Sequence, residues 1–187
     1  GLALMPITFG ISFTNTPMNH ARALVHIYQD GSVGISTAAV EMGQGVNTKM
    51  LQIAAQVFSI ENSKVKIETT NTTRVANTSP SAASSTADLN GKALLKACNL
   101  LRDRLKEIVA EEYKTQKEHI ELKDEFVYIN SEKTDLTWTA LIGKAMERRV
   151  ALSENAHYAT PIIHFDKTKE KGHPFAYHVY GTAIIIT

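Results

Sequence analysis

Cysteine is nearly absent from this sequence, which has one, Cys98, among 187 residues. A single thiol cannot form an intrachain disulfide, a Cys-rich zinc site or an iron–sulfur cluster, because each of these needs several cysteines. Cys98 falls on the apolar stripe of a predicted helix, and this position favours a packed thiol over a nucleophile. Any redox chemistry of the protein therefore needs a metal that cysteines of this chain do not hold.

The sequence also lacks an excess of charge of either sign and any long hydrophobic run. The 20 Lys and Arg residues against 19 Asp and Glu residues give a net charge of +1, which does not favour a polyanionic partner. No apolar run approaches the roughly 18 residues that a membrane span needs. With 43% hydrophobic residues the chain can bury a core. We expect a cytoplasmic protein that binds neither nucleic acid nor membrane.

Both ends of the sequence have the composition of strands. Residues 1–13 are β-prone from the start, and residues 181–187 form a β-branched run without a turn or a polar tail. A free-standing protein normally covers the unpaired backbone groups of such strands. We therefore expect residues 1–187 to be a single piece of one domain, excised from a larger subunit.

The pattern of apolar residues predicts two successive strand–loop–helix units. The dipeptide Asp30-Gly31 joins β-prone runs at 24–29 and 33–39, as expected for a hairpin. A helix is predicted from Val46 to Phe58, followed by a strand at 64–70 and then by the longest helical pattern, from Leu89 to Ile108.

Further short elements follow the second helix. A hairpin is predicted from the runs 119–122 and 126–129, and Thr137 can cap a short helix that ends near Glu147. Strands are expected at 150–153 and 174–186, with a charged loop at 166–172 between them. The fold class is therefore α+β, with a mixed or antiparallel sheet and two main helices packed on one face.

The first loop with possible chemistry spans residues 41–49 (Glu-Met-Gly-Gln-Gly-Val-Asn-Thr-Lys). Its two glycines allow a ligand to approach the backbone closely, and the helix that follows presents unpaired N–H groups to an anion or a planar polar group. The spacing matches neither a Walker A loop nor a Rossmann fingerprint. An ordinary Gly-rich connection is the alternative.

The second loop spans residues 77–88 and is rich in hydroxyl groups. Hydroxyls lie at positions 78, 79, 81, 84 and 85, followed by Thr86, and the small residues Ala82 and Ala83 leave room for a flat ligand. The alternative is a solvated Ser/Thr loop that caps a helix. The 7 histidines have no His-Glu-x-x-His spacing, so we expect no metal ligand among them.

Together, the two loops resemble cofactor segments of the molybdenum hydroxylases, the xanthine dehydrogenase and aldehyde oxidase family. Phe9-Gly10-Ile11-Ser12-Phe13, the hairpin at 28–33, Tyr158-Ala159-Thr160-Pro161 and the segment 174–181 agree in the same order. The resemblance covers nearly the whole chain. It implies a fragment of the molybdopterin-binding subunit, which would contact the rest of that subunit and the iron–sulfur and FAD domains or subunits.

The resemblance implies an enzyme that hydroxylates a ring carbon next to nitrogen, as in the purines hypoxanthine and xanthine, or oxidises an aldehyde. Gln44 would bond near the molybdenum or the pterin, the two alanines would form the floor, and the hydroxyls would bind the pterin or its phosphate. The implied residues for binding the molybdopterin–molybdenum cofactor are Met42, Gly43, Gln44, Ala82, Ala83, Ser84, Ser85 and Thr86.

The sequence departs from the family in two respects. Ala38-Ala39-Val40 stands where the family usually has glycines, and this difference could alter the approach of the loop and the substrate. The glutamate base of the family lies in another segment, and the matching position of Glu41 is not that base. No catalytic residue is therefore assigned in this chain, and an aldehyde oxidase, another azaheterocycle hydroxylase and a non-catalytic scaffold domain stay open as alternatives.

The isolated 187 residues should carry no molybdenum and show no turnover. The reason is that the other walls of the cofactor site are contributed by other segments, and half a site binds weakly. Elemental analysis of the purified fragment tests this expectation, and stoichiometric molybdenum would contradict it.

Overall fold

The structure, a computed structural model, describes residues 1–68, 70–161 and 163–187. The helices in this part are α1 (Val46–Phe58), α2 (Thr86–Tyr113) and α3 (Trp138–Glu147). The strands are β1 (Leu2–Ile11), β2 (His20–Ile27), β3 (Val33–Thr37), β4 (Val65–Ile67), β5 (Ile120–Lys123), β6 (Phe126–Ile129), β7 (Glu132–Thr137), β8 (Ser153–Ala159), β9 (His164–Asp166), β10 (Lys171–His173) and β11 (Tyr177–Ile186).

A four-stranded sheet in the order β4-β3-β2-β8 forms the centre of the fold. Strands β2 and β3 form the expected antiparallel hairpin, whereas β3 and β4 run parallel. In the hairpin turn, Gly31 has a positive φ of 83°, and the Asp30 carboxylate accepts hydrogen bonds from the N–H and the hydroxyl of Ser32. The Asp-Gly turn thus closes the hairpin of β2 and β3, as the sequence predicts.

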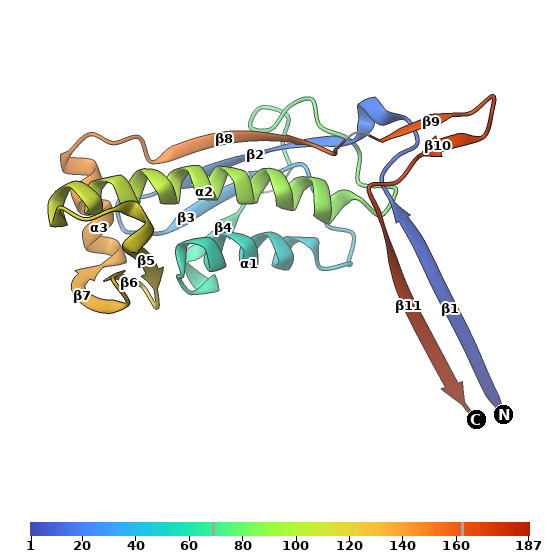
Figure 1. Cartoon of the computed structure of the whole chain (residues 1–187), viewed down its shortest axis with the longest axis horizontal. Coiled ribbons are helices and arrows are strands. Elements are labelled where there is room, and N and C mark those ends of the chain that lie inside the picture. The colour runs from blue at the N-terminus through green and yellow to red at the C-terminus, as the bar shows by residue number, and fades with distance from the viewer. Residues whose placement is uncertain (69, 162) are drawn as a thin grey trace.

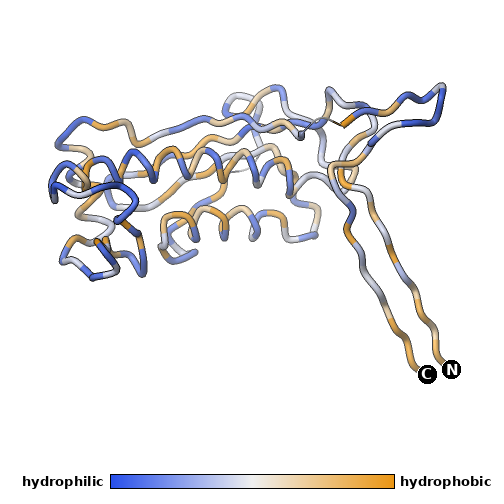
Figure 2. The backbone as a smooth tube through the Cα atoms, in the orientation of Figure 1, coloured by the Kyte–Doolittle hydropathy of each residue, from blue (hydrophilic) through white to orange (hydrophobic). Residues whose placement is uncertain are grey.

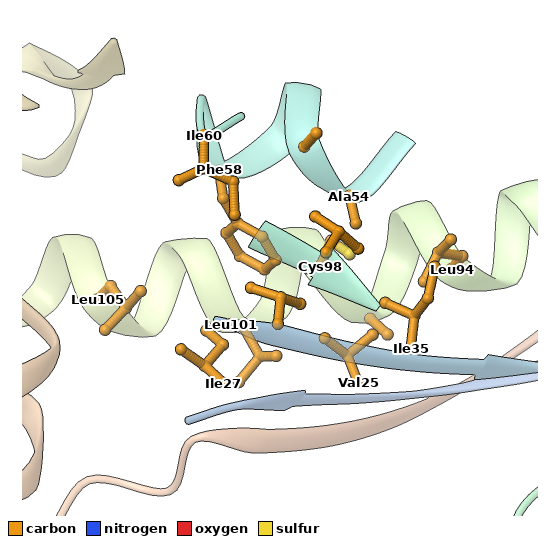
Figure 3. Close-up of a cluster of buried hydrophobic side chains, with 14 of the residues drawn as sticks. Val25, Ile27, Ile35, Ala54, Phe58, Ile60, Leu94, Cys98, Leu101 and Leu105 are labelled. Carbon is orange, nitrogen blue, oxygen red and sulfur yellow. The ribbon is translucent and has the colours of Figure 1, made fainter. Parts of the chain in front are cut away.

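Helices α1 and α2 pack side by side on one face of this sheet (Figure 1). Met50, Phe58 and Leu94 on their apolar stripes are completely buried. Together with Val25 and Ile35 of the sheet they belong to one hydrophobic core cluster, part of which is drawn in Figure 3. The predicted α+β class with two main helices on one face is confirmed.

Cys98 lies inside this core between the helices and the sheet (Figure 3). Burial raises the pKa of its thiol to about 12. The group is therefore protonated at neutral pH and packs as a small apolar side chain, as the sequence predicts.

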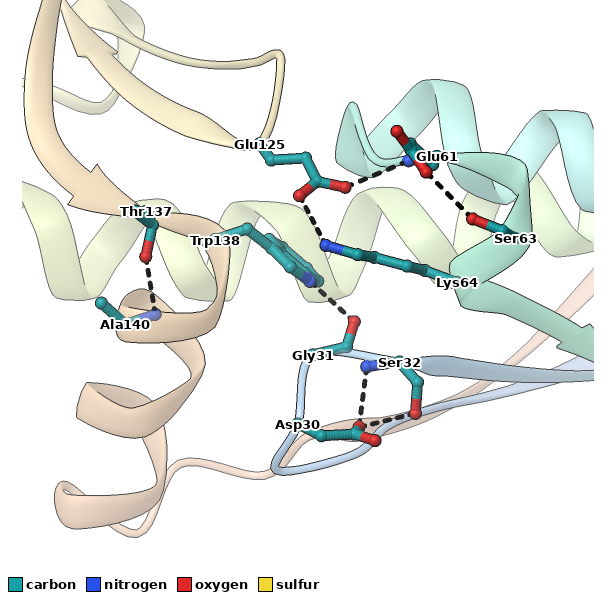
Figure 4. Close-up of polar contacts among 10 residues, drawn as sticks. All are labelled: Asp30, Gly31, Ser32, Glu61, Ser63, Lys64, Glu125, Thr137, Trp138 and Ala140. Carbon is teal, nitrogen blue, oxygen red and sulfur yellow. Dashed lines mark hydrogen bonds and ion pairs between the residues drawn. The ribbon is translucent and has the colours of Figure 1, made fainter.

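A three-stranded antiparallel sheet of β5, β6 and β7 and the helix α3 lie at the hairpin-turn end of the central sheet. The buried ring of Trp138 packs on Phe58 at 5.4 Å between centroids and donates its Nε1–H to the carbonyl of Gly31 at 2.7 Å (Figure 4). Thr137 accepts the N–H of Ala140 through its side-chain oxygen, which confirms it as the cap of α3. An ion pair between Lys64, just before β4, and Glu125, in the turn between β5 and β6, joins the central sheet to the three-stranded sheet.

Strands β1 and β11 form a separate two-stranded antiparallel ribbon that projects away from the central sheet (Figure 1). The pairing runs from Leu2 with Ile186 to Ile11 with Tyr177. Figure 2 shows that the outer part of the ribbon is hydrophobic although it stands clear of the rest of the chain. None of the helices in the described ranges is long and apolar enough to cross a membrane.

Some predicted boundaries are wrong. The strand expected at 150–153 begins only at Ser153, because the N–H of Val150 closes the end of α3 by bonding to the carbonyl of Ala145. The charged segment 166–172 is no plain loop, since its ends belong to the β9–β10 hairpin. Strand β4 is shorter than the run 64–70, in which Thr69 lies outside the described residues.

Two adjacent leucines of α2 provide a test of the core. Leu101 is completely buried, whereas Leu100 is 44% exposed. Leu101→Ala should lower the free energy of unfolding of this domain by about 2–5 kcal/mol, because it leaves a cavity in the core. The control Leu100→Ala should cost less than about 1 kcal/mol. The urea dependence of amide exchange in β2, measured in the full-length protein, gives both values, and equal costs would contradict the packing.

Candidate functional site

Several connections meet at the end of the central sheet opposite to the Asp30-Gly31 turn. Residues 38–45, here called loop A, follow β3, and residues 70–85, here called loop B, follow the parallel strand β4. Because β2 runs antiparallel to β3, the segment 12–19 before β2 reaches the same end. Helices α1 and α2 also begin here, so the positive ends of both helix dipoles face one region, called the loop edge (Figure 1).

The start of α1 is capped by a carboxylate of loop A. Glu41 accepts hydrogen bonds from the backbone N–H groups of Gly43 at 2.8 Å, Gly45 at 2.9 Å and Asn47 at 3.0 Å. The bond from Asn47, followed by that from Gly45, lowers the pKa of Glu41. A carboxylate of the chain itself thus occupies part of the helix end at which the sequence predicts an anion or a planar polar group, and a ligand there stays a prediction.

Gln44 shapes loop A through its side-chain amide. Its Nε2 donates to the carbonyl of Val40 at 2.8 Å, and its Oε1 accepts the N–H of Met42 at 2.6 Å. An amide nitrogen carries two hydrogens, so one N–H of Gln44 is left for a ligand. Gly43 and Gly45 have positive φ values, and a Cβ on either would meet nothing within 4 Å. Open space therefore lies in front of this backbone.

Loop B holds two consecutive non-glycine residues in the left-handed region. Ala83 has φ 52° and Ser84 has φ 53°, a conformation that costs about 1–2 kcal/mol per residue. Within the described residues, the backbone N–H groups of Ala83 and Ser84 make no hydrogen bond. Such strain is typical of ligand-binding segments. Loop B therefore presents free donors just before α2.

Loops A and B are joined by direct hydrogen bonds. The N–H of Val40 donates to the hydroxyl of Ser81 at 2.9 Å, and the N–H of Ala38 donates to Oδ1 of Asn90 at 3.1 Å. Asn90 is buried in the second turn of α2, where its Nδ2 donates to the carbonyl of Thr86 at 2.9 Å. The two loops that the sequence singles out thus form one surface.

The segment 12–19 is a third part of the loop edge. The buried Asn19 accepts the N–H of Phe13 at 2.7 Å and donates to its carbonyl at 2.8 Å. The hydroxyl of Ser79 in loop B donates to the carbonyl of Met18. Sequence reasoning assigned no role to Asn19, and its signal was only that of a polar residue placed directly before the apolar alternation of β2.

A cavity of about 240 Å³ lies between the start of α2 and the base of the ribbon. Burial raises the pKa of Asp88, which lines the cavity, against the opposing effect of Lys49 and Lys92. The other lining residues are Ile11, Ser12, Ser85, Leu89, Lys92, Tyr158, Thr160, Pro161, Ala176 and Tyr177. A larger hollow of about 750 Å³ lies between α1 and α2 and contains none of the predicted cofactor residues.

The predicted cofactor residues all lie at the loop edge but differ in exposure. Met42, Gly43, Gln44, Ala82 and Ser84 are exposed, and Ala83 and Thr86 are half-buried. Ser85 is buried, and its hydroxyl donates to the carbonyl of Ala82 at 3.1 Å, so this side chain shapes loop B from within. In the part of the chain that the structure describes, no three His, Cys, Asp or Glu residues are placed to hold a metal ion.

These features define an α+β domain in which two loops, joined by a hydrogen bond, lead into two helices. Residues 1–186 match the family model described as the molybdopterin cofactor-binding domain. The chain is 38% identical over 183 residues to xanthine dehydrogenase/oxidase of Mus musculus and 42% identical over 181 residues to xanthine dehydrogenase of Emericella nidulans. The chain therefore belongs to the molybdopterin cofactor-binding domain family and resembles the xanthine dehydrogenases within it.

These alignments cover 98% and 97% of this chain but only 12% of each relative. Solved structures share the fold. Quinoline 2-oxidoreductase from Pseudomonas putida 86 matches 85% of this chain and 22% of its own, with a TM-score of 0.75 and 22% identity. Aldehyde oxidoreductase from Desulfovibrio gigas matches 98% of this chain and 18% of its own, with a TM-score of 0.71 and 18% identity.

The pKa of Glu41 should lie below its ordinary value of 4.5. The contribution of the charged carboxylate to loop A is then complete at neutral pH and is lost as the pH falls through the lowered pKa. Amide exchange at Gly43, Gly45 and Asn47 in the full-length protein, corrected for intrinsic rates, should stay slow down to pH 4.5 and accelerate below it.

The variant Glu41→Gln is the control for this pH dependence. It should exchange faster at pH 7 and show no acceleration on acidification, because a neutral amide is a weaker acceptor and does not titrate. Amides of α2 report any global unfolding. An unchanged acid transition in Glu41→Gln would assign the effect to another group.

Proposed function

We propose that this chain holds the molybdopterin–molybdenum cofactor at the loop edge, as one part of a molybdenum hydroxylase that oxidises a purine such as hypoxanthine or xanthine. The observation that carries the proposal is that loop A is bonded to loop B through Ser81 and to α2 through Asn90, in front of two helix starts. Such an arrangement can contact a flat ligand with an anionic arm from two sides. Residues 1–187 act here as a single piece of the cofactor-binding domain.

The residues present fit the cofactor. Glu41 already occupies the start of α1, so the anionic arm of the pterin is directed to loop B, where the N–H groups of Ala83 and Ser84 and the first turn of α2 are donors. The free N–H of Gln44 is the donor for a polar edge of the ligand. Ala82, with its small exposed side chain, leaves room for a flat ring system.

The remaining predicted residues act on the same ligand. Gly43 and Met42 place Gln44, and the open space before Gly43 admits the ligand to the backbone. The hydroxyls of Ser84 and Thr86 bind the pterin or its phosphate, and Ser85 keeps loop B in shape through its bond to Ala82. When bound, the cofactor supplies the redox-active molybdenum, and this chain orients it.

A purine substrate is supported by the identity of 37–42% to proteins named as xanthine dehydrogenases. Aldehyde and quinoline oxidoreductases share the fold at only 18% and 22% identity, so an aldehyde or another azaheterocycle is the second candidate. The exposed side chain of Val40, next to Glu41 on loop A, is a candidate for tuning this choice. The proposed partners are the rest of the molybdenum subunit and the iron–sulfur and FAD domains or subunits.

Gln44→Ala in the full-length protein tests the proposal. The variant loses the amide that shapes loop A and the donor to the ligand, so molybdenum content should fall and purine oxidation should drop about two- to tenfold, as expected for a hydrogen bond worth about 0.5–1.5 kcal/mol. Molybdenum per protein and the rate of xanthine oxidation are the measurements.

Gln52→Ala is the matched control, because Gln52 is also an exposed glutamine but lies on α1, outside loop A. It should leave both values unchanged. If Gln44→Ala also leaves both unchanged, the assignment of Gln44 is wrong. If the unmodified full-length protein binds molybdenum but oxidises aldehydes and no purine, the second candidate replaces the first.

A further inference from the structure

The two faces of the β1–β11 ribbon differ in composition. Residues that pair directly across an antiparallel ribbon share a face, and Leu2 pairs with Ile186. One face therefore carries the odd-numbered residues of both strands, from 3 to 11 and from 177 to 185, and all of them except Tyr177 at the base are apolar or glycine. We call this the odd face, and it is apolar from the tip to Ile11 and Val179 near the base.

The opposite, even face is apolar only near the tip of the ribbon. Leu2, Leu4, Ile184 and Ile186 form the outer half of this face and are 75%, 64%, 62% and 79% exposed. Nearer the central sheet, the pairs Thr8 with Tyr180 and Gly10 with His178, together with Thr182, make the face polar. The even face thus changes from apolar at the tip to polar near the central sheet.

Such a ribbon is not stable by itself in water. A two-stranded ribbon is marginal without a layer against its apolar face, and exposed apolar surface of this extent marks an interaction site. A single covering layer would bury the odd face but would leave the apolar tip of the even face in water. From this composition we expect protein layers on both faces of the ribbon at its tip and on the odd face alone at its base.

We propose that the ribbon is inserted between two layers of the remainder of the full-length polypeptide, one covering the whole odd face and the other only the outer half of the even face. The chain spans 12% of the length of its relatives, so the same polypeptide offers ample chain for both layers. A twofold contact with a second copy through the odd face would leave the apolar tip of the even face uncovered.

The odd face also leads into the loop edge. Its last pair, Ile11 with Tyr177, lines the 240 Å³ cavity together with Ser85 and Asp88 at the start of α2. The segment that covers the odd face therefore reaches the open side of this cavity and closes it. This docking follows from the ribbon alone and does not require a bound cofactor.

Cysteine labelling of the full-length protein tests the proposal. Ile7→Cys lies on the odd face, Leu4→Cys on the outer half of the even face and Thr8→Cys on its inner half. Labelling by a maleimide is followed on the peptide that contains each new cysteine, while the buried Cys98, whose pKa is raised to about 12, serves as the unreactive reference within the same chain. Ile7→Cys and Leu4→Cys should label at least tenfold more slowly than Thr8→Cys.

Three results would overturn the proposal. Equal, fast labelling at all three positions would show a free ribbon, and slow labelling of Thr8→Cys would show that the even face is covered throughout. Protection at Ile7→Cys that disappears when dilution dissociates an oligomer would assign the cover to a second copy. If a variant does not fold, amide exchange of residues 2–11 in the unmodified full-length protein decides, with slow exchange expected and rapid exchange contradicting the insertion.

Discussion

The buried side-chain amide of Asn90 is the contact on which the candidate site depends. Its oxygen accepts the N–H of Ala38 in loop A, and its nitrogen donates to the carbonyl of Thr86 at the start of α2. An apolar side chain at this position would leave the N–H of Ala38 without its partner, at a cost of about 1–3 kcal/mol. Asn90 thus holds loop A against α2, the helix that follows loop B.

Two helices begin at the loop edge, and the chain uses them differently. Glu41 accepts the N–H of Asn47 in the first turn of α1 and the N–H groups of Gly43 and Gly45 just before it. In loop B, Ala83 and Ser84 take up left-handed conformations, and their N–H groups make no hydrogen bond within the described residues. The two helix starts therefore differ, since only that of α1 has a carboxylate of the preceding loop bonded to its backbone.

Much of the fold is readable in the sequence because it rests on local chemistry. Asp30-Gly31 predicts the hairpin, Thr137 the cap of α3, and the apolar period both main helices, as the structure confirms. Strand β7 was missed because Glu132–Thr137 is mostly polar and owes its conformation to pairing with β6. The two loops are singled out by their glycines and hydroxyl groups, whereas the roles of their residues come only from the resemblance to a family.

The sequence by itself determined the elements, the buried Cys98 and the two loops, since turns, caps and apolar periods act over a few residues. Tertiary structure alone decided that loops A and B meet, because the bond between Val40 and Ser81 spans 41 residues and a polar side chain carries no sign of a partner so far away.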